Sequence, residues 1–297
     1  MSDLKKRLAV VAVATIAIFG GIAFVAYLLV GTPAPVAPAE IVKVKVPDTS
    51  PRHVVIGSSV EGRTIDSYTY GRGGTRLGFV GGMHGGYEWN SILLAYDLMD
   101  YLTAHPESIP ANLSITVIPD ANPDGVHKVL GAEGRFTALD VPTGTDLVPG
   151  RYNADTVDLN RNFACNWQAT STFLGKITSA GTAAFSEPEA RAIRDFVLAN
   201  TPKAMVFLHS KSGAVYASEC NNGILPKTLE IMNVYARAAG YRAINVFDAY
   251  KITGDAEGWL ASIGIPAITV ELTTHETVEW ERNLSGIKAL FEYYKTQ

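Results

Sequence analysis

From about residue 52 to the C-terminus, short apolar runs alternate with segments whose apolar residues recur at helical spacing. The apolar runs have the length of buried strands and read LGFVGG, LSITVIPD, AMVFLHS and AITVEL. The helical segments read NSILLAYDLMDYLTAH, SEPEARAIRDFVLAN, PKTLEIMNVYARAAG and VEWERNLSGIKALFEYY. In the second of these, Ser186 and Glu189 have the spacing of a capping box. The alternation predicts a single α/β domain in which helices cover both faces of one sheet.

The N-terminal pattern differs, because residues 8–30 form a run of 23 residues without a charge. As a helix this run would be about 34 Å long, enough to cross a bilayer core. Three basic residues precede it at 5–7, so we expect the chain after it to lie outside the cytoplasm. The predicted parts are a cytoplasmic N-terminus, a transmembrane anchor, a Pro/Ala-rich linker and an exported domain, at 1–7, 8–30, 31–51 and 52–297. A signal peptide cleaved near 37–39 is the competing interpretation, and it would release the same domain as a secreted protein.

Composition excludes some partners. The 297 residues carry a net charge of −4 and form no basic stripe, so we expect no nucleic-acid partner. No feature indicates an obligate protein partner either. Cys165 and Cys220 are the only cysteines, and both belong to the exported part, where thiols oxidise. We therefore expect a disulfide between them, with two buried free thiols as the alternative.

Three side chains with metal or acid–base chemistry follow or end apolar strand runs. They are His84 after LGFV, His209 at the end of MVFLH, and Glu271 at the end of ITVE. Glu88 lies four residues after His84, in a glycine-flanked turn. Sites in α/β sheets gather at the carboxyl ends of strands, and two histidines plus one glutamate form a common ligand set of catalytic zinc. A polar turn with a helix cap is the plainer interpretation of the same turn.

A second group of residues can bind anions. Arg161 offers a planar fork that grips a carboxylate, Asn160 adds a donor, and Arg151 could face a developing oxyanion. On composition alone, the favoured interpretation is ordinary surface arginines in a loop.

The chain resembles the zinc carboxypeptidases, peptidase family M14, over about residues 52–295. The motifs that carry the resemblance occur in the family's order and read GSSVEGRTI, HGGYE, NPDG, VDLNRNF, FLHS, YKITGDAEGW and ITVEL. The resemblance implies a mixed, mainly eight-stranded twisted sheet with helices on both faces. It also implies one Zn²⁺ per chain and a peptide substrate with a free C-terminal carboxylate.

Matched position by position, the resemblance assigns His84, Glu88 and His209 as zinc ligands. Glu271 becomes the general base, and Arg151 the residue that polarises the scissile carbonyl. The substrate-binding residues would be Asn160 and Arg161, which hold the terminal carboxylate, and Tyr250, which closes over the terminal residue.

The chain departs from the family pattern in two places. The family usually spaces its first ligands as His-x-x-Glu, whereas one more residue separates them here, and we expect Gly85 and Gly86 to absorb it. The interval from Arg151 to Asn160 is longer in some branches, which leaves Arg135 as a rival for the carbonyl-polarising role.

The substrate is less well defined. Glu257 falls where the resemblance places a residue of the pocket floor, so a basic terminal residue is expected, with Asp255 as a second candidate. His275 is a candidate partner behind the metal ligands. The main prediction is a metallocarboxypeptidase. The alternatives are a cell-wall peptidase that cuts γ-D-glutamyl-diaminopimelate stem peptides, a related N-acyl amino acid deacylase, and an inactive binding module.

Overall fold

The computed structural model describes residues 2–29, 50–248 and 250–297. It divides into two compact units, Met1–Pro47 and Asp48–Gln297, which are treated separately. Most of the predicted linker at 31–51 lies outside the described residues.

The described part of the first unit is one helix, α1 (Ser2–Leu29). Its stretch Lys6–Val25 is long and apolar enough to cross a membrane, judged by length and composition. Membrane anchors and signal sequences share these properties. The choice between them, and the orientation of the helix, stay predictions.

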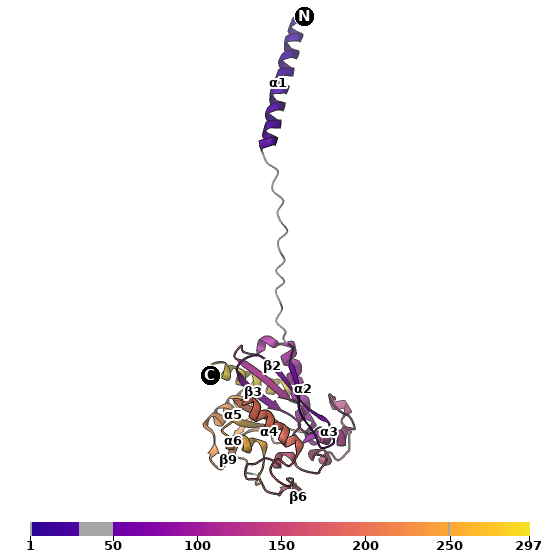
Figure 1. The fold of residues 1–297 in the computed structure, drawn as a ribbon, viewed down its shortest axis with the longest axis vertical. Coiled ribbons are helices and arrows are strands. Elements are labelled where there is room, and N and C mark those ends of the chain that lie inside the picture. Colours follow the sequence, from indigo (N-terminus) through magenta and orange to yellow (C-terminus); the bar gives the residue numbers. More distant parts are fainter. Residues whose placement is uncertain (1, 30–49, 249) are drawn as a thin grey trace. The chain divides into compact units, whose positions relative to one another are not determined.

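The second unit contains the α/β domain (Figure 1). Its strands are β1 (Arg52–Ser58), β2 (Thr64–Gly71), β3 (Thr75–Val80), β4 (Leu113–Ile118), β5 (Thr170–Phe173), β6 (Lys176–Ser179), β7 (Ala204–Ser210), β8 (Ala214–Ala217), β9 (Glu219–Cys220), β10 (Gly223–Ile224), β11 (Arg242–Ile244) and β12 (Ala267–Leu272). Its α-helices are α2 (Trp89–Ala104), α3 (Pro123–Leu130), α4 (Pro188–Asn200), α5 (Pro226–Ala239), α6 (Ala256–Ser262) and α7 (Trp280–Lys295). Short 3₁₀ helices are η1 (Gly85–Glu88), η2 (Pro106–Ser108), η3 (Ala138–Asp140), η4 (Val148–Arg151) and η5 (Leu159–Arg161).

Eight strands form one mixed sheet in the order β1-β2-β4-β3-β7-β12-β8-β11. The central strands β4, β3, β7 and β12 run parallel to one another, while β2 and β8 pair antiparallel at either side of them. The carboxyl ends of the central strands therefore meet at one edge of the sheet, as the alternating pattern predicted.

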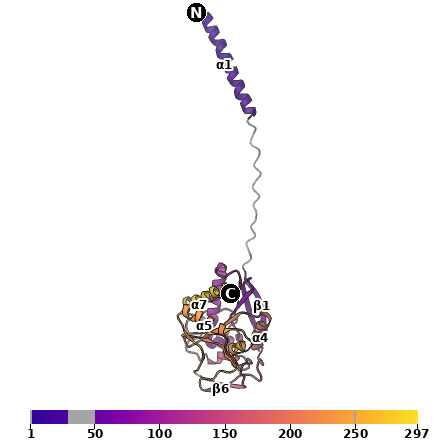
Figure 2. The same ribbon diagram turned by 90° about the vertical axis from the view of Figure 1, so that its left-hand side faces the viewer.

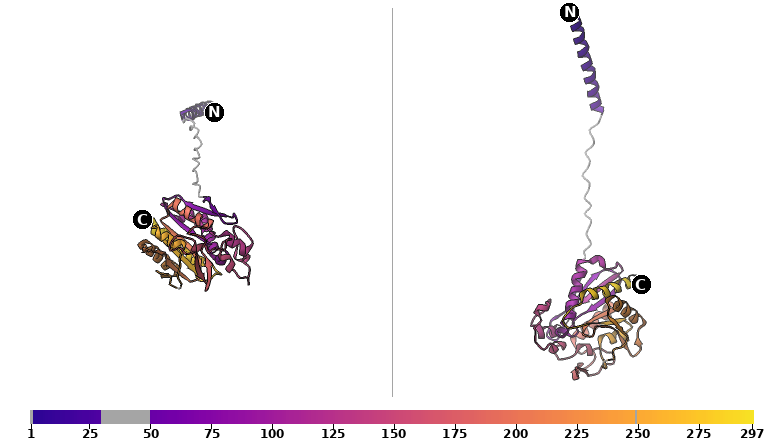
Figure 3. Two further views of the ribbon diagram at one scale, coloured as in Figure 1. Left: turned by 60° about the horizontal axis from the view of Figure 1, so that its bottom comes forward. Right: turned by 180° about the vertical axis from the view of Figure 1, so that it is seen from behind.

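Helices cover both faces of the sheet. Apolar residues of α2, α5 and α7 form one core cluster, and those of α4 and α6 form a second cluster on the opposite face. Figure 2 shows α5 and α7 on one side and α4 on the other, and Figure 3 shows the C-terminal helix α7 beside α5. In β7, Val206 and Leu208 face the first cluster while Met205 and Phe207 face the second. The two-residue period of the strand thus puts His209 on the α4/α6 face.

One local prediction is wrong. Ser186 and Glu189 do not form a capping box, because α4 begins at Pro188 and its N-cap residue is Glu187. The Ser186 hydroxyl donates to the Glu187 carboxylate instead. The Glu189 carboxylate accepts from the Val60 N–H and from Asn153. Ser186 and Glu189 are therefore hydrogen-bonded to other residues and not to each other's backbone at the start of the helix.

Candidate metal centre and active site

Two strand ends bring His209 and Glu271 together. The parallel strands β7 and β12 are paired in a register that sets His209 directly against Glu271. Both side chains point to the α4/α6 face, since Phe207 and Ala267, which stand at even spacing from them, pack there. His209 is buried, and Glu271 is half-buried.

The turn after β3 supplies His84 and Glu88. Glu88 ends η1, the 3₁₀ helix that follows His84 directly. Gly85 has a φ of +42°, and a Cβ there would stand 2.6 Å from the Gly150 carbonyl oxygen. Only glycine fits both constraints, and the tight turn places the two side chains together despite the extra residue between them.

The side chains of His84, Glu88 and His209 converge on one point. His84 Nδ1 lies 2.7 Å from Glu88 Oε1, and His209 Nδ1 lies 2.9 Å from Glu88 Oε2. The two Nδ1 atoms are 3.2 Å apart, and all three side chains are buried. Their ligand atoms lie within 4.8 Å of one another, so the group could hold a metal ion. Two imidazole nitrogens and a carboxylate oxygen are donors that suit zinc, and the residues present therefore fit this metal.

The electrostatics agree with a cation site. Burial opposes ionisation of Glu88, but the two imidazoles beside it hold its pKa well below the usual range. Burial also disfavours a charged His209, yet the Glu88 and Glu257 carboxylates raise its pKa to about 10. Burial and the negative charge of Glu88 raise the pKa of Glu271 to about 8. A metal cation entering this cluster would compete with protons for the same groups.

Arg151 lies at the same cluster, at the end of η4. Its Nε donates to Asp158 Oδ2 at 2.9 Å, and its Nη1 is 3.7 Å from Glu88 Oε1. Its guanidinium carbon lies 3.9 Å from the centre of the Phe173 ring. The rival Arg135 is half-exposed, pairs with Asp100 and lines a separate groove beside α2.

Asn160 and Arg161 are buried in η5. Asn160 Oδ1 accepts from the Ala256 N–H at 2.9 Å, and Arg161 Nη1 donates to the Asn160 carbonyl at 2.6 Å. Gly254, at a φ of +68°, packs so closely that a Cβ would stand 2.2 Å from the Arg161 carbonyl oxygen. The segment before α6 thus fixes both residues.

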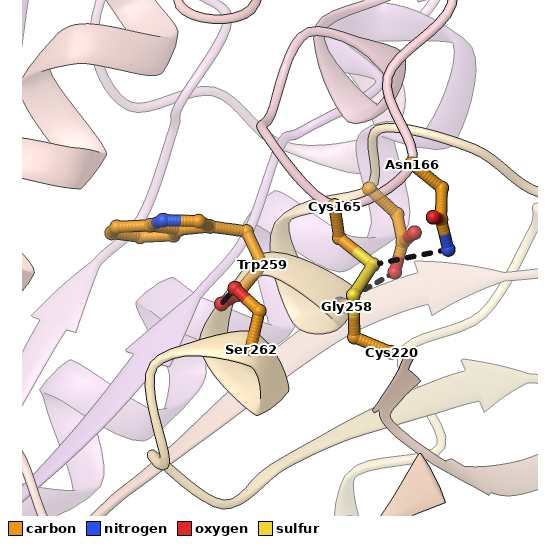
Figure 4. The surroundings of a disulfide bond; sticks show 7 residues. Cys165, Asn166, Cys220, Gly258, Trp259 and Ser262 are labelled. Carbon is orange, nitrogen blue, oxygen red and sulfur yellow. Dashed lines mark hydrogen bonds between the residues drawn. A yellow bond between two sulfur atoms is a disulfide. The ribbon is translucent and has the colours of Figure 1, made fainter. Parts of the chain in front are cut away.

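A disulfide joins Cys165 to Cys220, as predicted, with 6.2 Å between the two Cα atoms. Figure 4 shows it beside the α6 residues Gly258 and Trp259. The Cys165 carbonyl accepts from the Gly254 N–H at 2.7 Å. The bond therefore ties the β9–β10 hairpin to the segment that follows Arg161.

One cavity of about 730 Å³ joins the predicted residues. The predicted site residues that line it are His84, Glu88, Arg151, Asn160, Arg161, His209, Tyr250, Glu257 and Glu271. Tyr250 is 45% exposed and packs edge-on against Phe247.

Two acidic candidates for the pocket floor have partners within the protein. Glu257 is buried and accepts from the Thr269 hydroxyl, and Asp255 caps α6 by accepting from the Gly258 N–H. Behind the ligands, the Ser210 N–H donates to Glu88 Oε2, and the Ser210 hydroxyl contacts His275 Nδ1 at 2.7 Å.

Sequence reasoning missed Asp158. This fully buried carboxylate pairs with Arg151, and its Oδ1 lies 3.4 Å from His84 Nε2. Burial would raise its pKa, but Arg151 and Arg161 hold that pKa far below the usual range. The available signal was its place in VDLNRNF, two residues before Asn160.

The fold and the cluster together are those of a metal-dependent hydrolase. The chain matches the family model Peptidase_M14, zinc carboxypeptidase, over residues 45–287, and it belongs to that family of zinc hydrolases. It is 29% identical to carboxypeptidase B of Astacus astacus over 167 residues, 53% of this chain and 53% of that protein. The chain spans about half the length of the curated relatives it matches.

Solved structures confirm the predicted fold. Carboxypeptidase A from Helicoverpa armigera matches with a TM-score of 0.63 and 22% identity, over 83% of this chain and 68% of that one. Murein-tripeptide amidase MpaA from Escherichia coli O157 matches with a TM-score of 0.58 and 19% identity, over 82% of this chain and 92% of that one.

Proposed function

We propose that the chain is a zinc-dependent metallocarboxypeptidase that hydrolyses the C-terminal peptide bond of peptides. The observation that carries the proposal is the buried group of His84, Glu88 and His209, set directly beside Glu271 in one cavity with two arginines. A ligand set, a base and an anion-binding side chain around one space are the parts that metal-assisted amide hydrolysis requires.

The chemical roles follow from position. Zinc held by His84, Glu88 and His209 would polarise the scissile carbonyl and acidify a water molecule. Glu271 takes a proton from the attacking water and passes it to the leaving amine nitrogen as the C–N bond breaks. Arg151 donates to the carbonyl oxygen as negative charge develops on it. Because Asp158 holds the Arg151 fork by two short contacts, little reorientation is needed during the reaction.

Substrate positioning is assigned to three other residues that line the cavity. Arg161 and Asn160 bind the terminal carboxylate, which restricts cleavage to the last peptide bond. Tyr250, exposed at the rim, closes over the terminal residue. A preference for basic terminal residues through Glu257 stays a prediction.

A second candidate is a cell-wall peptidase acting on γ-D-glutamyl-diaminopimelate stem peptides. Its support is the fold shared with murein-tripeptide amidase MpaA, which extends over 92% of that chain. Both substrates present a free carboxylate next to an amide. The pair Arg161 and Asn160, called the carboxylate clamp below, could therefore bind either one. An exported domain, anchored by α1 or released after cleavage, would suit both activities.

A substrate panel tests the proposal. The full chain, purified in mild detergent, is given blocked dipeptides ending in Lys or Leu and, separately, stem peptides. We expect release of the terminal residue, loss of activity with a chelator and recovery with Zn²⁺. Faster cleavage of stem peptides would select the second candidate. Stoichiometric zinc without hydrolysis of any member of the panel would instead support an inactive binding module.

A further inference from the structure

The two candidate metal histidines have matching surroundings. Each directs Nδ1 to Glu88, and each has a carboxylate oxygen 3.4 Å from Nε2. For His84 that oxygen belongs to Asp158, and for His209 it belongs to Glu257. Glu257 therefore stands to His209 as Asp158 stands to His84.

Local structure fixes Glu257 in this place. It lies in the first turn of α6, whose start is held by the Asp255 cap, and it is only 3% exposed. The Thr269 hydroxyl donates to Glu257 Oε1 at 3.0 Å, the same oxygen that faces His209. Thr269 is two residues before Glu271 on β12, so it lies on the same face of the strand. One strand thus carries the candidate base and the residue that orients Glu257.

We propose that Glu257 is a positioning residue for the metal centre, acting through His209. A metal-bound imidazole usually donates its second N–H to a carboxylate, which fixes the tautomer and the ring orientation. Glu257 Oε1 is the acceptor available to His209 Nε2, whose buried nitrogen has no hydrogen-bond partner among the described residues. Glu257 Oε1 is thus engaged within the protein, while Glu257 Oε2 has no hydrogen-bond partner among the described residues, so the choice of the terminal residue is measured separately.

The inference rests on the proposed zinc site, and zinc affinity tests it. Affinity is measured by competition with a chromophoric chelator, using the full chain in detergent at one fixed pH. The variants are Glu257→Ala and the conservative Glu257→Gln. The glutamine variant keeps the size of the side chain and still tests the inference if the alanine variant does not fold. Glu219→Gln is the control, because this exposed glutamate lines the same cavity without contacting a ligand histidine. The ratio of kcat/KM for terminal Lys and Leu is measured alongside.

We expect Glu257→Ala to weaken zinc binding about 10–100-fold, with a smaller loss of at least threefold in Glu257→Gln, and the Lys/Leu ratio to stay within about twofold. Zinc affinity decides the outcome. If zinc affinity falls less than threefold in the Glu257 variants relative to Glu219→Gln, the inference is overturned. If the Lys/Leu ratio falls sharply while zinc affinity is unchanged, Glu257 acts in substrate selection instead. If the wild-type chain itself binds no zinc, it is the proposed function that fails.

Discussion

Glu271 of β12 stands directly opposite His209 of β7, in a continuous parallel register that runs from Ala267 to Leu272. Neighbouring strands lie about 4.8 Å apart, and hydrogen bonds fix their register. The candidate base and a candidate metal ligand are therefore parts of one rigid element. The sheet holds their separation constant, while the loops around the cavity carry the groups proposed to bind substrate.

Arg151 should be needed for turnover and not for zinc binding. Arg151→Lys keeps a positive charge but loses the planar fork, so we expect kcat to fall by roughly 10²-fold with zinc content unchanged. Steady-state kinetics and metal analysis of the same sample measure both quantities. Arg135→Lys is the matched control and should behave like the wild type. Similar kinetics in the two variants would contradict the role given to Arg151.

Arg161 should make the enzyme selective for substrates with a free C-terminal carboxylate. We expect the wild type to prefer a peptide acid over its amide, and Arg161→Gln to lose that preference through a rise in KM of about tenfold or more. Paired assays on acid and amide substrates measure the effect. Arg194→Gln, which alters a partly buried arginine paired with Asp195 outside the cavity lining, is the control. An unchanged acid-to-amide ratio in Arg161→Gln would count against the clamp.

Zinc binding should release a proton at neutral pH. Because its two carboxylate neighbours raise the pKa of His209 to about 10, the imidazole of the metal-free protein is protonated at pH 7 and must lose that proton to bind zinc. Affinity should therefore rise with pH from 7 to 9, by up to about tenfold per unit, and level off above the pKa. Calorimetry in buffers of different ionisation enthalpy counts the protons. Affinity independent of pH, with no proton release, would contradict this.

The disulfide should stabilise both the domain and the clamp. In the chain-entropy model, a bond between residues 55 positions apart contributes about 4 kcal/mol. Cys165→Ser with Cys220→Ser should thus lower the unfolding temperature. It should also raise KM more than it lowers kcat, since Cys165 is hydrogen-bonded to Gly254, whose backbone packs against Arg161. A reducing agent should reproduce these effects in the wild type and add nothing in the double variant. Equal unfolding temperatures of the wild type and the double variant would refute a stabilising disulfide between Cys165 and Cys220.

The parts of the site that sequence predicts best are those fixed by strand periodicity. His209 and Glu271 end apolar runs, and ends of parallel strands meet at one edge by geometry alone. Glu88 was predictable because a glycine turn limits where its side chain can go. Asp158 was not, because its contact with His84 spans 74 residues and depends on how two loops pack. The direction of Glu257 likewise depends on the packing of α6 against β12, which no local pattern encodes.

The most direct test separates zinc binding from catalysis in Glu271→Gln. Zinc per chain and kcat/KM on the best substrate of the panel are measured together for this variant and the wild type. We expect one zinc in both proteins and a loss of activity of at least about 10³-fold in the variant, because the proton-accepting carboxylate is gone while the ligands remain. A fully active Glu271→Gln, or a wild-type chain that hydrolyses peptides without zinc, would contradict the proposed mechanism.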